Sequence, residues 1–368
     1  MANNRKILIN RVAALDFRNY QEAEAFLSPK WTVFYGKNGA GKTNFLELLV
    51  LNLQGVSFRG KIRNLLRWET SETKIVTEIK NGPKIATRIF FDVNKIKHER
   101  LLDGHPATVF EDVVPPIVLF LPQEEYLLDS PGGRRRILSR GLILQSQTYR
   151  QHYGQYVRLL KQRNSLLRGG RVGDVAEELG AWTEAIVEPM IHIWLLRQKF
   201  IEVLNEKLPT IVKKLGGITL SLRAELVLGG LSPVTIKPTA ELIFSRFSEL
   251  SWRESEMKTT QIGPHRDLFR FTHNSQDVLP LLSRGQRRLL LLALHIIEGE
   301  YAADSLGVEP LFILDDIFSE LDQKHREAIG QTLENCQVIA TTADKKILPK
   351  LGEETVYYEV ESGSLKNV

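Results

Sequence analysis

The sequence has few of the residues that build covalently or metal-stapled folds. Cys336 is the only cysteine among 368 residues, which excludes an intramolecular disulfide framework and a zinc site made of several cysteines. No stretch offers about 18 consecutive apolar residues, the length that a membrane-spanning helix needs. The first residues, MANNRKILIN, lack the apolar core of a signal peptide. We therefore expect a protein of the reducing cytoplasm that has no membrane partner.

The overall composition excludes a disordered or fibrous chain. Apolar residues make up 43% of the sequence and charged residues 25%, which is close to the globular average. A chain of 368 residues is too long for one ordinary domain, so we expect two.

Acidic residues are missing from one long segment. Residues 131–173 contain ten Lys or Arg and no Asp or Glu, whereas the whole chain has a net charge of only +5. The rest of the chain is therefore net negative. This asymmetry favours a polyanionic partner such as nucleic acid. The alternative is that these cations pair with carboxylates from other parts of the fold.

The residue pattern changes twice along the chain. Strands are predicted in the first part, at Lys6–Leu15, Thr32–Tyr35, Lys74–Lys80, Ile85–Val93 and Ile117–Leu121. A helical middle begins near Arg134 and contains strand-like stretches at Ile218–Leu228 and Leu268–Thr272 and a helix over Gln286–Tyr301. The end alternates again, with strands at Leu311–Leu314, Gln337–Thr341 and Val356–Val360 around a helix at Gln323–Glu334. This order indicates an α/β domain that is split by an insertion.

One basic helix is predicted over Leu144–Arg168. At 100° per residue, four cations fall on one face, within about 80° of one another: Arg150, Arg158, Lys161 and Arg168. Tyr and Leu residues occupy the other side, and Val157 and Arg163 are the exceptions. Gly169-Gly170 ends the helix, and Asp174 could cap a second helix that runs to about Leu208.

A phosphate-binding loop is the strongest local signal. Residues 36–43 read Gly36, Lys37, Asn38, Gly39, Ala40, Gly41, Lys42 and Thr43, after a predicted strand and before a helix. Glycines let backbone N–H groups turn toward the phosphates, the Lys supplies a point charge, and the Thr hydroxyl reaches Mg²⁺. We therefore predict ATP and Mg²⁺ as cofactors.

Two acids follow a later apolar strand. Leu311–Leu314 leads into Asp315 and Asp316, which places both at the carboxyl edge of a parallel sheet. Asp315 would hold Mg²⁺ and Asp316 would be the general base that orients the attacking water. A capping role for Asp316 is the alternative. The P-loop and this strand lie at opposite ends of the chain.

A second anion-binding turn precedes the acidic strand. Ser283, Gly285 and Gln286 lie ahead of a leucine-rich helix, whose N-terminal N–H groups and the Ser hydroxyl can bind phosphate. On its own, the same pattern also fits a simple helix start.

In this order, these motifs resemble an ABC-type ATPase head. Gln123, after the predicted strand Ile117–Leu121, corresponds to the glutamine of such heads, and Ser319–Asp322 follow the two acids. Further features resemble the RecF recombination mediators of the SMC-like branch, from end to end: Asn44 after the P-loop, Ser57-Phe58-Arg59, Ser130-Pro131 before Arg134-Arg135-Arg136, Gly263–Asp267, and Asp315–Asp322. The resemblance implies an α/β head formed by 1–124 and 300–368, and a mostly helical lobe, 125–299, inserted in it.

The resemblance also implies the activity and the partners. Such a protein is an ATP-driven homodimer of recombinational repair, replication restart and the SOS response. It binds double-stranded DNA at single-strand/double-strand junctions and works with RecR, and indirectly RecO, to load RecA. Gln123 would contact the metal and the attacking water, and Asn44 the nucleotide. Ser283, Gly285 and Gln286 would close on the ATP of the partner copy.

Slow ATP hydrolysis, stimulated by DNA, would then release the dimer. Asp316 is one methylene shorter than the Glu of most ABC ATPases, so we predict turnover well below the typical value of about 10 per second. The main alternatives are another SMC-like ATPase of DNA metabolism and the nucleotide-binding subunit of a transporter. The arginine-rich insertion argues against the transporter.

Charge assigns the DNA contacts. The candidates are Arg59, Lys61, Arg63, Arg134, Arg135, Arg150, Arg158, Lys161 and Arg168, which would neutralise phosphates without reading bases. At least one of Arg134–Arg136 is expected to form a buried pair instead. For His265 and Arg266, an anchoring role is favoured over a catalytic one.

The chain departs from the family pattern in two places. Arg284 and Arg287 stand where the family usually has glutamines. Either Thr341 or Thr342 replaces the switch histidine of ABC ATPases.

Overall fold

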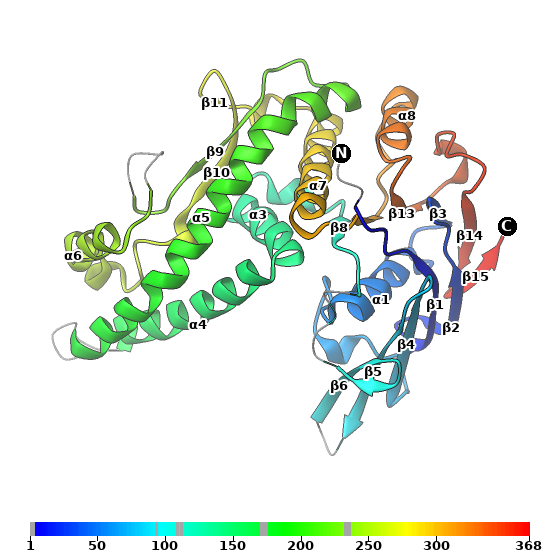
Figure 1. Cartoon of the computed structure of the whole chain (residues 1–368), viewed down its shortest axis with the longest axis horizontal. Coiled ribbons are helices and arrows are strands. Elements are labelled where there is room, and N and C mark those ends of the chain that lie inside the picture. The colour runs from blue at the N-terminus through cyan, green and yellow to red at the C-terminus, as the bar shows by residue number, and fades with distance from the viewer. Residues whose placement is uncertain (1–3, 93–94, 108–109, 111–112, 170–175, 232–236) are drawn as a thin grey trace. The chain divides into compact units, whose positions relative to one another are not determined.

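The computed structural model describes the chain except residues 1–3, 93–94, 108–109, 111–112, 170–175 and 232–236. Internal contacts divide it into two compact units (Figure 1). The first unit, here called the head, comprises Met1–Pro122, Lys213–Gly217 and Glu298–Val368. The second, the lobe, comprises Gln123–Val212 and Ile218–Ile297. The predicted α/β class with a mostly helical insertion is confirmed.

The head contains a mixed six-stranded sheet in the order β15-β14-β3-β13-β12-β8. Five strands are parallel to their neighbours and β15 is antiparallel to β14. The inner strands β3, β12 and β13 are almost continuously buried, as expected for a parallel sheet that is covered on both faces. The strands are β3 (Trp31–Tyr35), β8 (Ile117–Phe120), β12 (Leu311–Leu314), β13 (Gln337–Thr342), β14 (Val356–Glu361) and β15 (Ser364–Asn367).

A second, antiparallel sheet of the head has the order β2-β1-β4-β5-β6-β7. In its central strands buried and more exposed residues alternate, so only one face belongs to the core. Helix α1 (Lys42–Gln54) contacts β1, β4 and β5 of this sheet and β13 of the mixed sheet. The strands are β1 (Ile9–Phe17), β2 (Tyr20–Phe26), β4 (Glu72–Ile79), β5 (Lys84–Asp92), β6 (Lys95–Leu102) and β7 (His105–Pro106).

Short helices complete the head. After α1 the chain forms the 3₁₀ turn η1 (Ile62–Asn64), and α8 (Gln323–Thr332) lies between β12 and β13 in the sequence. The 3₁₀ turn η4 (Lys345–Ile347) follows β13. Asp322 caps α8 by accepting a hydrogen bond from the backbone N–H of His325 at 2.9 Å.

Two antiparallel helices dominate the lobe. Tyr149, His152 and Arg163 of α4 (Gln147–Gly169) contact Arg197, His192 and Thr183 of α5 (Ala176–Leu215), respectively. Figure 1 shows the two helices side by side. The other helices of the lobe are α2 (Glu124–Leu127), α3 (Pro131–Gln145) and α6 (Ala240–Met257), and α7 (Arg284–Leu306) runs on from the lobe into the head.

A small sheet in the order β11-β10-β9 completes the lobe. Leu268–His273 (β10) is its central strand, between β9 (Arg223–Val227) and β11 (Gln276–Asp277). The 3₁₀ turns η2 (Pro264–Arg266) and η3 (Leu279–Leu281) flank β10 and β11 in the sequence.

The helix predicted over Leu144–Arg168 is in fact two helices. Ser146 is extended, with φ −134° and ψ 113°, and ends α3. Its hydroxyl oxygen then accepts a hydrogen bond from the backbone N–H of Tyr149 at 3.1 Å, so the same residue caps α4. The predicted strand Ile218–Leu228 is regular only over Arg223–Val227. Asp174 lies outside the described residues.

Candidate nucleotide site and basic surfaces

The loop between β3 and α1 has the geometry of a phosphate-binding loop. Gly36 and Gly41 have φ of +152° and +120°, which disfavours any side chain. A Cβ at Gly36 would lie 2.3 Å from the carbonyl oxygen of Val360, and one at Gly41 would lie 2.5 Å from Asn19 Nδ2. The loop therefore packs closely at both ends and requires glycine there.

Lys42 is folded back over this loop. Its Nζ donates hydrogen bonds to the carbonyl oxygens of Gly36 at 2.6 Å and of Lys37 at 3.0 Å. Burial lowers the pKa of Lys42, while the charges of Asp316 and Asp315 act in the opposite direction. The ammonium is thus held where the phosphates of a nucleotide would lie against the loop.

A cluster of oxygen ligands lies beside the loop, at the ends of three elements of the head. The hydroxyl of Thr43, in the first turn of α1, donates to the Asp315 carboxylate at 2.8 Å. The hydroxyl of Thr341, on β13, donates to Asp315 Oδ1 at 2.6 Å. Asp315 is 6% exposed, and both of these partners are neutral hydroxyls.

The donor set of this cluster fits Mg²⁺. That ion prefers oxygen ligands and usually keeps several waters, with one or two carboxylates and substrate phosphates. The described residues contain no group of three or more His, Cys, Asp or Glu side chains that could form an all-protein cage. Thr43 and Asp315 are therefore suited to an ion that is shared with phosphate.

The structure gives the two threonines of β13 different roles. Thr341 binds Asp315 and also accepts a hydrogen bond from the backbone N–H of Asp316 at 2.9 Å. Thr342 instead donates to the carbonyl oxygen of Asp344 at 3.3 Å. Asp316 has a left-handed backbone, with φ +48°, so it turns the chain sharply after the acidic strand.

A cavity of about 860 Å³ opens next to the phosphate-binding loop within the head. Its walls come from the loop, from the segment after β13 and from the end of β14. Lys345 lies over the rings of Tyr35 and Tyr357, 5.4 and 4.3 Å from their centroids. The volume is in the usual range for a small-molecule site.

Sequence reasoning missed the turn between β1 and β2. Asn19 Nδ2 donates to the carbonyl oxygen of Ala40 at 2.9 Å, and Asn19 Oδ1 accepts from Asn44 Nδ2 at 2.8 Å. The hydroxyl of Tyr20 donates to the carbonyl oxygen of Gly41 at 3.0 Å. Asn19 and Tyr20 thus support the loop, and only the turn-like Asn could have been noticed in the sequence.

A buried carboxylate fixes the segment after α1. Glu47 is fully buried and accepts two hydrogen bonds from Arg18, both at 2.9 Å. The Ser57 hydroxyl donates to the same carboxylate at 2.6 Å. Arg59, two residues later, donates to Asn44 Oδ1 at 2.8 Å. The predicted DNA-binding residues Arg59, Lys61 and Arg63 are all exposed.

In the lobe, the predicted second anion-binding turn, Ser283–Gln286, is closed by a helix-capping pair. The backbone N–H of Ser283 donates to Gln286 Oε1 at 3.0 Å, and the backbone N–H of Gln286 donates to the Ser283 hydroxyl oxygen at 3.3 Å. This reciprocal pair is a capping box at the start of α7. Gln123 precedes α2 as its N-cap residue.

The two arginines that depart from the family pattern differ in their surroundings. Arg287 donates to Asp129 at 2.7 Å and to the carbonyl oxygen of Leu279 at 2.9 Å. Arg284 and Ser283 are exposed. Only Arg284 therefore presents its charge to solvent at this turn.

The predicted basic residues of the lobe fall into two groups. Arg158, Lys161 and Arg168 are exposed on α4. Three others bind inside the lobe: Arg134 to Asp277 at 2.7 Å, Arg135 to the carbonyl oxygen of Asp267 at 2.8 Å, and Arg150 to that of Ile143 at 3.0 Å. Arg134 is 7% exposed. Arg134 thus forms the buried pair that was expected for at least one of Arg134–Arg136, and its charge is neutralised by Asp277 rather than available to DNA.

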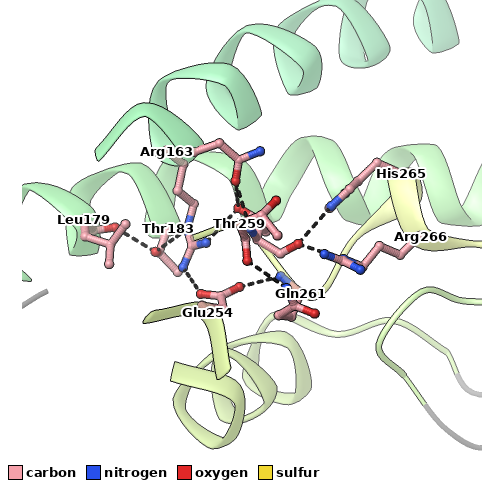
Figure 2. Close-up of polar contacts among 10 residues, drawn as sticks. Arg163, Leu179, Thr183, Glu254, Thr259, Gln261, His265 and Arg266 are labelled. Carbon is pink, nitrogen blue, oxygen red and sulfur yellow. Dashed lines mark hydrogen bonds and ion pairs between the residues drawn. The ribbon is translucent and has the colours of Figure 1, made fainter. Parts of the chain in front are cut away.

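Arg163 belongs to a buried network rather than to the basic face (Figure 2). It donates to Glu254 at 2.6 Å, to the Thr260 hydroxyl at 2.8 Å and to the Thr183 hydroxyl at 3.0 Å. Arg163 and Glu254 are each 2% exposed. This explains why Arg163 broke the charge pattern of the helix.

His265 and Arg266 bind the same network (Figure 2). His265 Nε2 lies 3.1 Å from the carbonyl oxygen of Thr260, to which Arg266 Nε donates at 2.7 Å. Nδ1 of His265 lies 2.5 Å from the hydroxyl of Tyr156, so the ring donates through Nε2 and accepts through Nδ1. Burial lowers the pKa of His265 to about 4, against the hydrogen bond to Thr260, which raises it. This neutral ring is an anchor between α4 and the turn before β10.

Comparison with known proteins identifies the family of this chain. The model of the RecF/RecN/SMC N-terminal domain matches residues 8–365. The "DNA replication and repair protein RecF" of Carboxydothermus hydrogenoformans is 30% identical, over 96% of this chain and 99% of that protein. Two solved structures of the recombination mediator RecF in the RecFOR pathway, RecF-ATPrS and RecF-ATP, superpose with TM-scores of 0.83 and 0.82. Each is 22% identical in sequence, and each match covers 100% of this chain. The matches cover 100% of the RecF-ATPrS chain and 99% of the RecF-ATP chain.

The sequence match to RecF and the structural match to RecF each extend over nearly the whole chain. Among the helices in the described ranges, none has the length and apolar character needed to cross a membrane. The chain belongs to the RecF family of DNA replication and repair proteins, within the RecF/RecN/SMC group.

Proposed function

We propose that this chain is a slow, DNA-stimulated ATPase whose ATP-bound form is a homodimer that holds double-stranded DNA during recombinational repair. The observation that carries the proposal is the cluster of Thr43, Asp315 and Thr341 beside the phosphate-binding loop. Together with Lys42 of the loop, whose pKa burial lowers and the charges of Asp316 and Asp315 raise, this cluster supplies the hydroxyl, carboxylate and lysine that phosphoryl transfer with Mg²⁺ requires.

Different residues of the head bind the phosphates, hold the metal and activate the water. The N–H groups of Gly36–Gly41 and the ammonium of Lys42 bind the phosphates. Thr43 and Asp315 would hold Mg²⁺, which neutralises charge on the phosphates when it is bound. Asp316 accepts a proton from the attacking water. Its carboxylate is on a short side chain, so we expect hydrolysis to be slow.

The partner copy completes each site in this proposal. Ser283, Gly285 and Gln286 at the N-terminus of α7 would bind the γ-phosphate of the ATP that the partner's loop holds. Gln123 would contact the metal and the water. Hydrolysis then removes a ligand that stabilises the dimer, so the copies separate.

DNA would be held through phosphates. The exposed cations of α4 and of the segment after α1 carry no base-reading geometry, so binding is tolerant of sequence. We propose junctions between single and double strands as the target, and RecR as the direct partner, through which RecO and RecA act.

Solution size with and without ATP tests the proposal. We expect ATP-dependent dimers for the wild type, monomers for Ser283→Arg, and dimers that persist for Asp316→Asn because hydrolysis is blocked. Ser251→Arg adds the same charge at an exposed position of α6 and should behave as wild type. A wild-type chain that stays monomeric with saturating ATP and duplex DNA would overturn the proposal.

A further inference from the structure

The segment after α1 presents one aromatic side chain almost completely to solvent. Trp68 is 91% exposed, the largest exposed fraction among the exposed large hydrophobic side chains of the described residues. Two other tryptophans, Trp31 and Trp194, are 3% and 0% exposed. The indole of Trp68 therefore contributes almost nothing to the core of the head.

The backbone that carries Trp68 is nevertheless firmly held. The backbone N–H of Arg67 donates to the carbonyl oxygen of Asp16 at 2.9 Å, and Leu66 is buried and bridges to Phe17. The hydroxyl of Thr70 donates to the carbonyl oxygen of Arg67 at 2.9 Å. Trp68 and the residue after it thus form the tip of a closed turn. Because this backbone is already ordered, a ligand that binds the ring has to order only the Trp68 side chain.

The residues before Trp68 are strongly basic. Arg59, Lys61 and Arg63 are exposed and Arg67 is partly exposed, whereas Glu69 is the only acid between Gln54 and Thr70. A protein partner that binds an exposed Trp usually covers a continuous apolar patch. Exposed cations in the same short segment as an exposed aromatic ring are instead a combination that suits single-stranded nucleic acid.

We propose that Trp68 stacks on an unpaired base at the junction of single- and double-stranded DNA, while Arg59, Lys61 and Arg63 bind the neighbouring phosphates. Bases inside a continuous duplex are already stacked on both faces, so the indole finds a free face only at a gap or an end. The inference rests on the proposed DNA-binding function and supplies a residue that distinguishes a junction from plain duplex.

The test compares Trp68→Ala with wild type on two DNAs at one salt concentration with ATP. We expect Trp68→Ala to weaken binding to gapped duplex by about tenfold, since stacking on one base contributes roughly 1–3 kcal/mol. Binding to continuous duplex should change less than twofold. Trp68→Phe should keep most of the preference. Trp252→Ala removes another exposed tryptophan, 64% exposed on α6, and should change neither affinity.

A gap made of abasic sites separates stacking from phosphate binding. It keeps every phosphate and removes every base, so the wild type should bind it as Trp68→Ala binds the normal gap. In addition, gapped DNA should quench tryptophan fluorescence in the wild type and not in Trp68→Ala.

Two results would overturn the inference while leaving the proposed function in place. One is equal weakening of gapped and continuous duplex by Trp68→Ala. The other is an unchanged preference for gaps, which would assign Trp68 to a protein partner. A wild type that binds neither DNA contradicts the proposed function itself.

Discussion

Asp315 of the head and two buried carboxylates of the lobe, Asp267 and Glu254, have partners of opposite kinds. In the head, Asp315 is 6% exposed and receives hydrogen bonds from the hydroxyls of Thr43 and Thr341. In the lobe, Asp267 and Glu254 are 0% and 2% exposed, and each is paired with a buried arginine. The three carboxylates are similarly buried, but hydroxyls bind the first and arginines bind the other two.

This difference separates a site from a scaffold. A buried carboxylate whose hydrogen-bond donors are neutral keeps an attraction for a cation that arrives later, such as Mg²⁺. A carboxylate that is already paired with a guanidinium does not attract a further cation in this way. Removing one member of such a pair leaves an uncompensated buried charge, which destabilises the fold. The same Asp→Asn exchange should therefore have different consequences in the two units.

The largest effect on stability is expected for Asp267→Asn. Asp267 Oδ1 accepts from the indole N–H of Trp194 at 2.8 Å and from the backbone N–H of Gly229 at 2.7 Å, and Oδ2 binds Arg197. Burial raises the pKa of Asp267, but these partners are all donors, so the carboxylate is the form that the site accommodates.

The exchange places an NH₂ group among donors and leaves the buried charge of Arg197 without its carboxylate partner, while the hydrogen bonds of Arg197 to Tyr149, Pro264 and Ser139 remain. We expect the free energy of unfolding to fall by about 3–5 kcal/mol. Urea unfolding followed through the fluorescence of buried tryptophans measures it. Asp315→Asn, the matched exchange in the head, should change stability by less than about 1 kcal/mol. Equal losses in both variants would contradict the distinction.

Asp315→Asn should instead remove activity. The amide keeps an acceptor for the hydroxyls of Thr43 and Thr341 but no longer carries the charge that holds Mg²⁺. Loss of about 3 kcal/mol of charge stabilisation corresponds to a turnover lower by roughly 100-fold. Phosphate release at increasing Mg²⁺ concentrations measures this. Turnover and Mg²⁺ dependence like those of the wild type would remove Asp315 from the metal site.

The sequence alone was sufficient for the residues that act through a local pattern. The glycines of the P-loop, the acids after β12 and the helix start at Ser283 all lie where their motifs predicted, because the spacing of each motif fixes its place on a strand end or a helix end. The strands that were predicted in the head match the observed ones to within a few residues, whereas β2, β6, β7 and β15 were not predicted.

What the sequence could not predict depends on contacts between distant residues. The sequence predicted a buried pair for at least one of Arg134–Arg136, but not that Arg134 forms it with Asp277, 143 positions away. It set Arg163 apart from the basic face without giving its partner Glu254, 91 positions away. Asn19 supports the P-loop from a turn with no motif of its own. Ser146 interrupts a helix whose apolar periodicity continues through it. In each case the deciding partner is supplied by the fold.

The anchor at His265 predicts a smaller, pH-dependent effect in the lobe. Burial lowers the pKa of His265 to about 4, whereas an exposed histidine titrates near 6.5. The unfolded chain therefore binds the proton first as the pH falls, so the stability from the neutral ring is complete above about pH 6.5 and is lost progressively toward pH 4.

Between pH 7 and pH 5 this amounts to about 2 kcal/mol. Urea unfolding of wild type and His265→Gln at both values measures it. The Gln variant cannot titrate and should lose less stability between the two values by that amount. If both lose the same amount, His265 is not the buried neutral group inferred here.

The smallest effect on stability is expected on the exposed face of α4, where Arg158 and Lys161 lie on the same helix as the buried Arg163. Changing Arg158 and Lys161 together to Ala should alter the free energy of unfolding by no more than about 0.5 kcal/mol per site. DNA binding should weaken, and the slope of log affinity against log salt should become shallower by roughly 2, since each cation releases about one counterion.

Gln155→Ala with Gln162→Ala changes two neutral exposed residues of the same helix and should leave the slope unchanged. An unaltered slope in the cation variant would show that this face does not contact DNA phosphates, and would leave the segment after α1 as the remaining candidate.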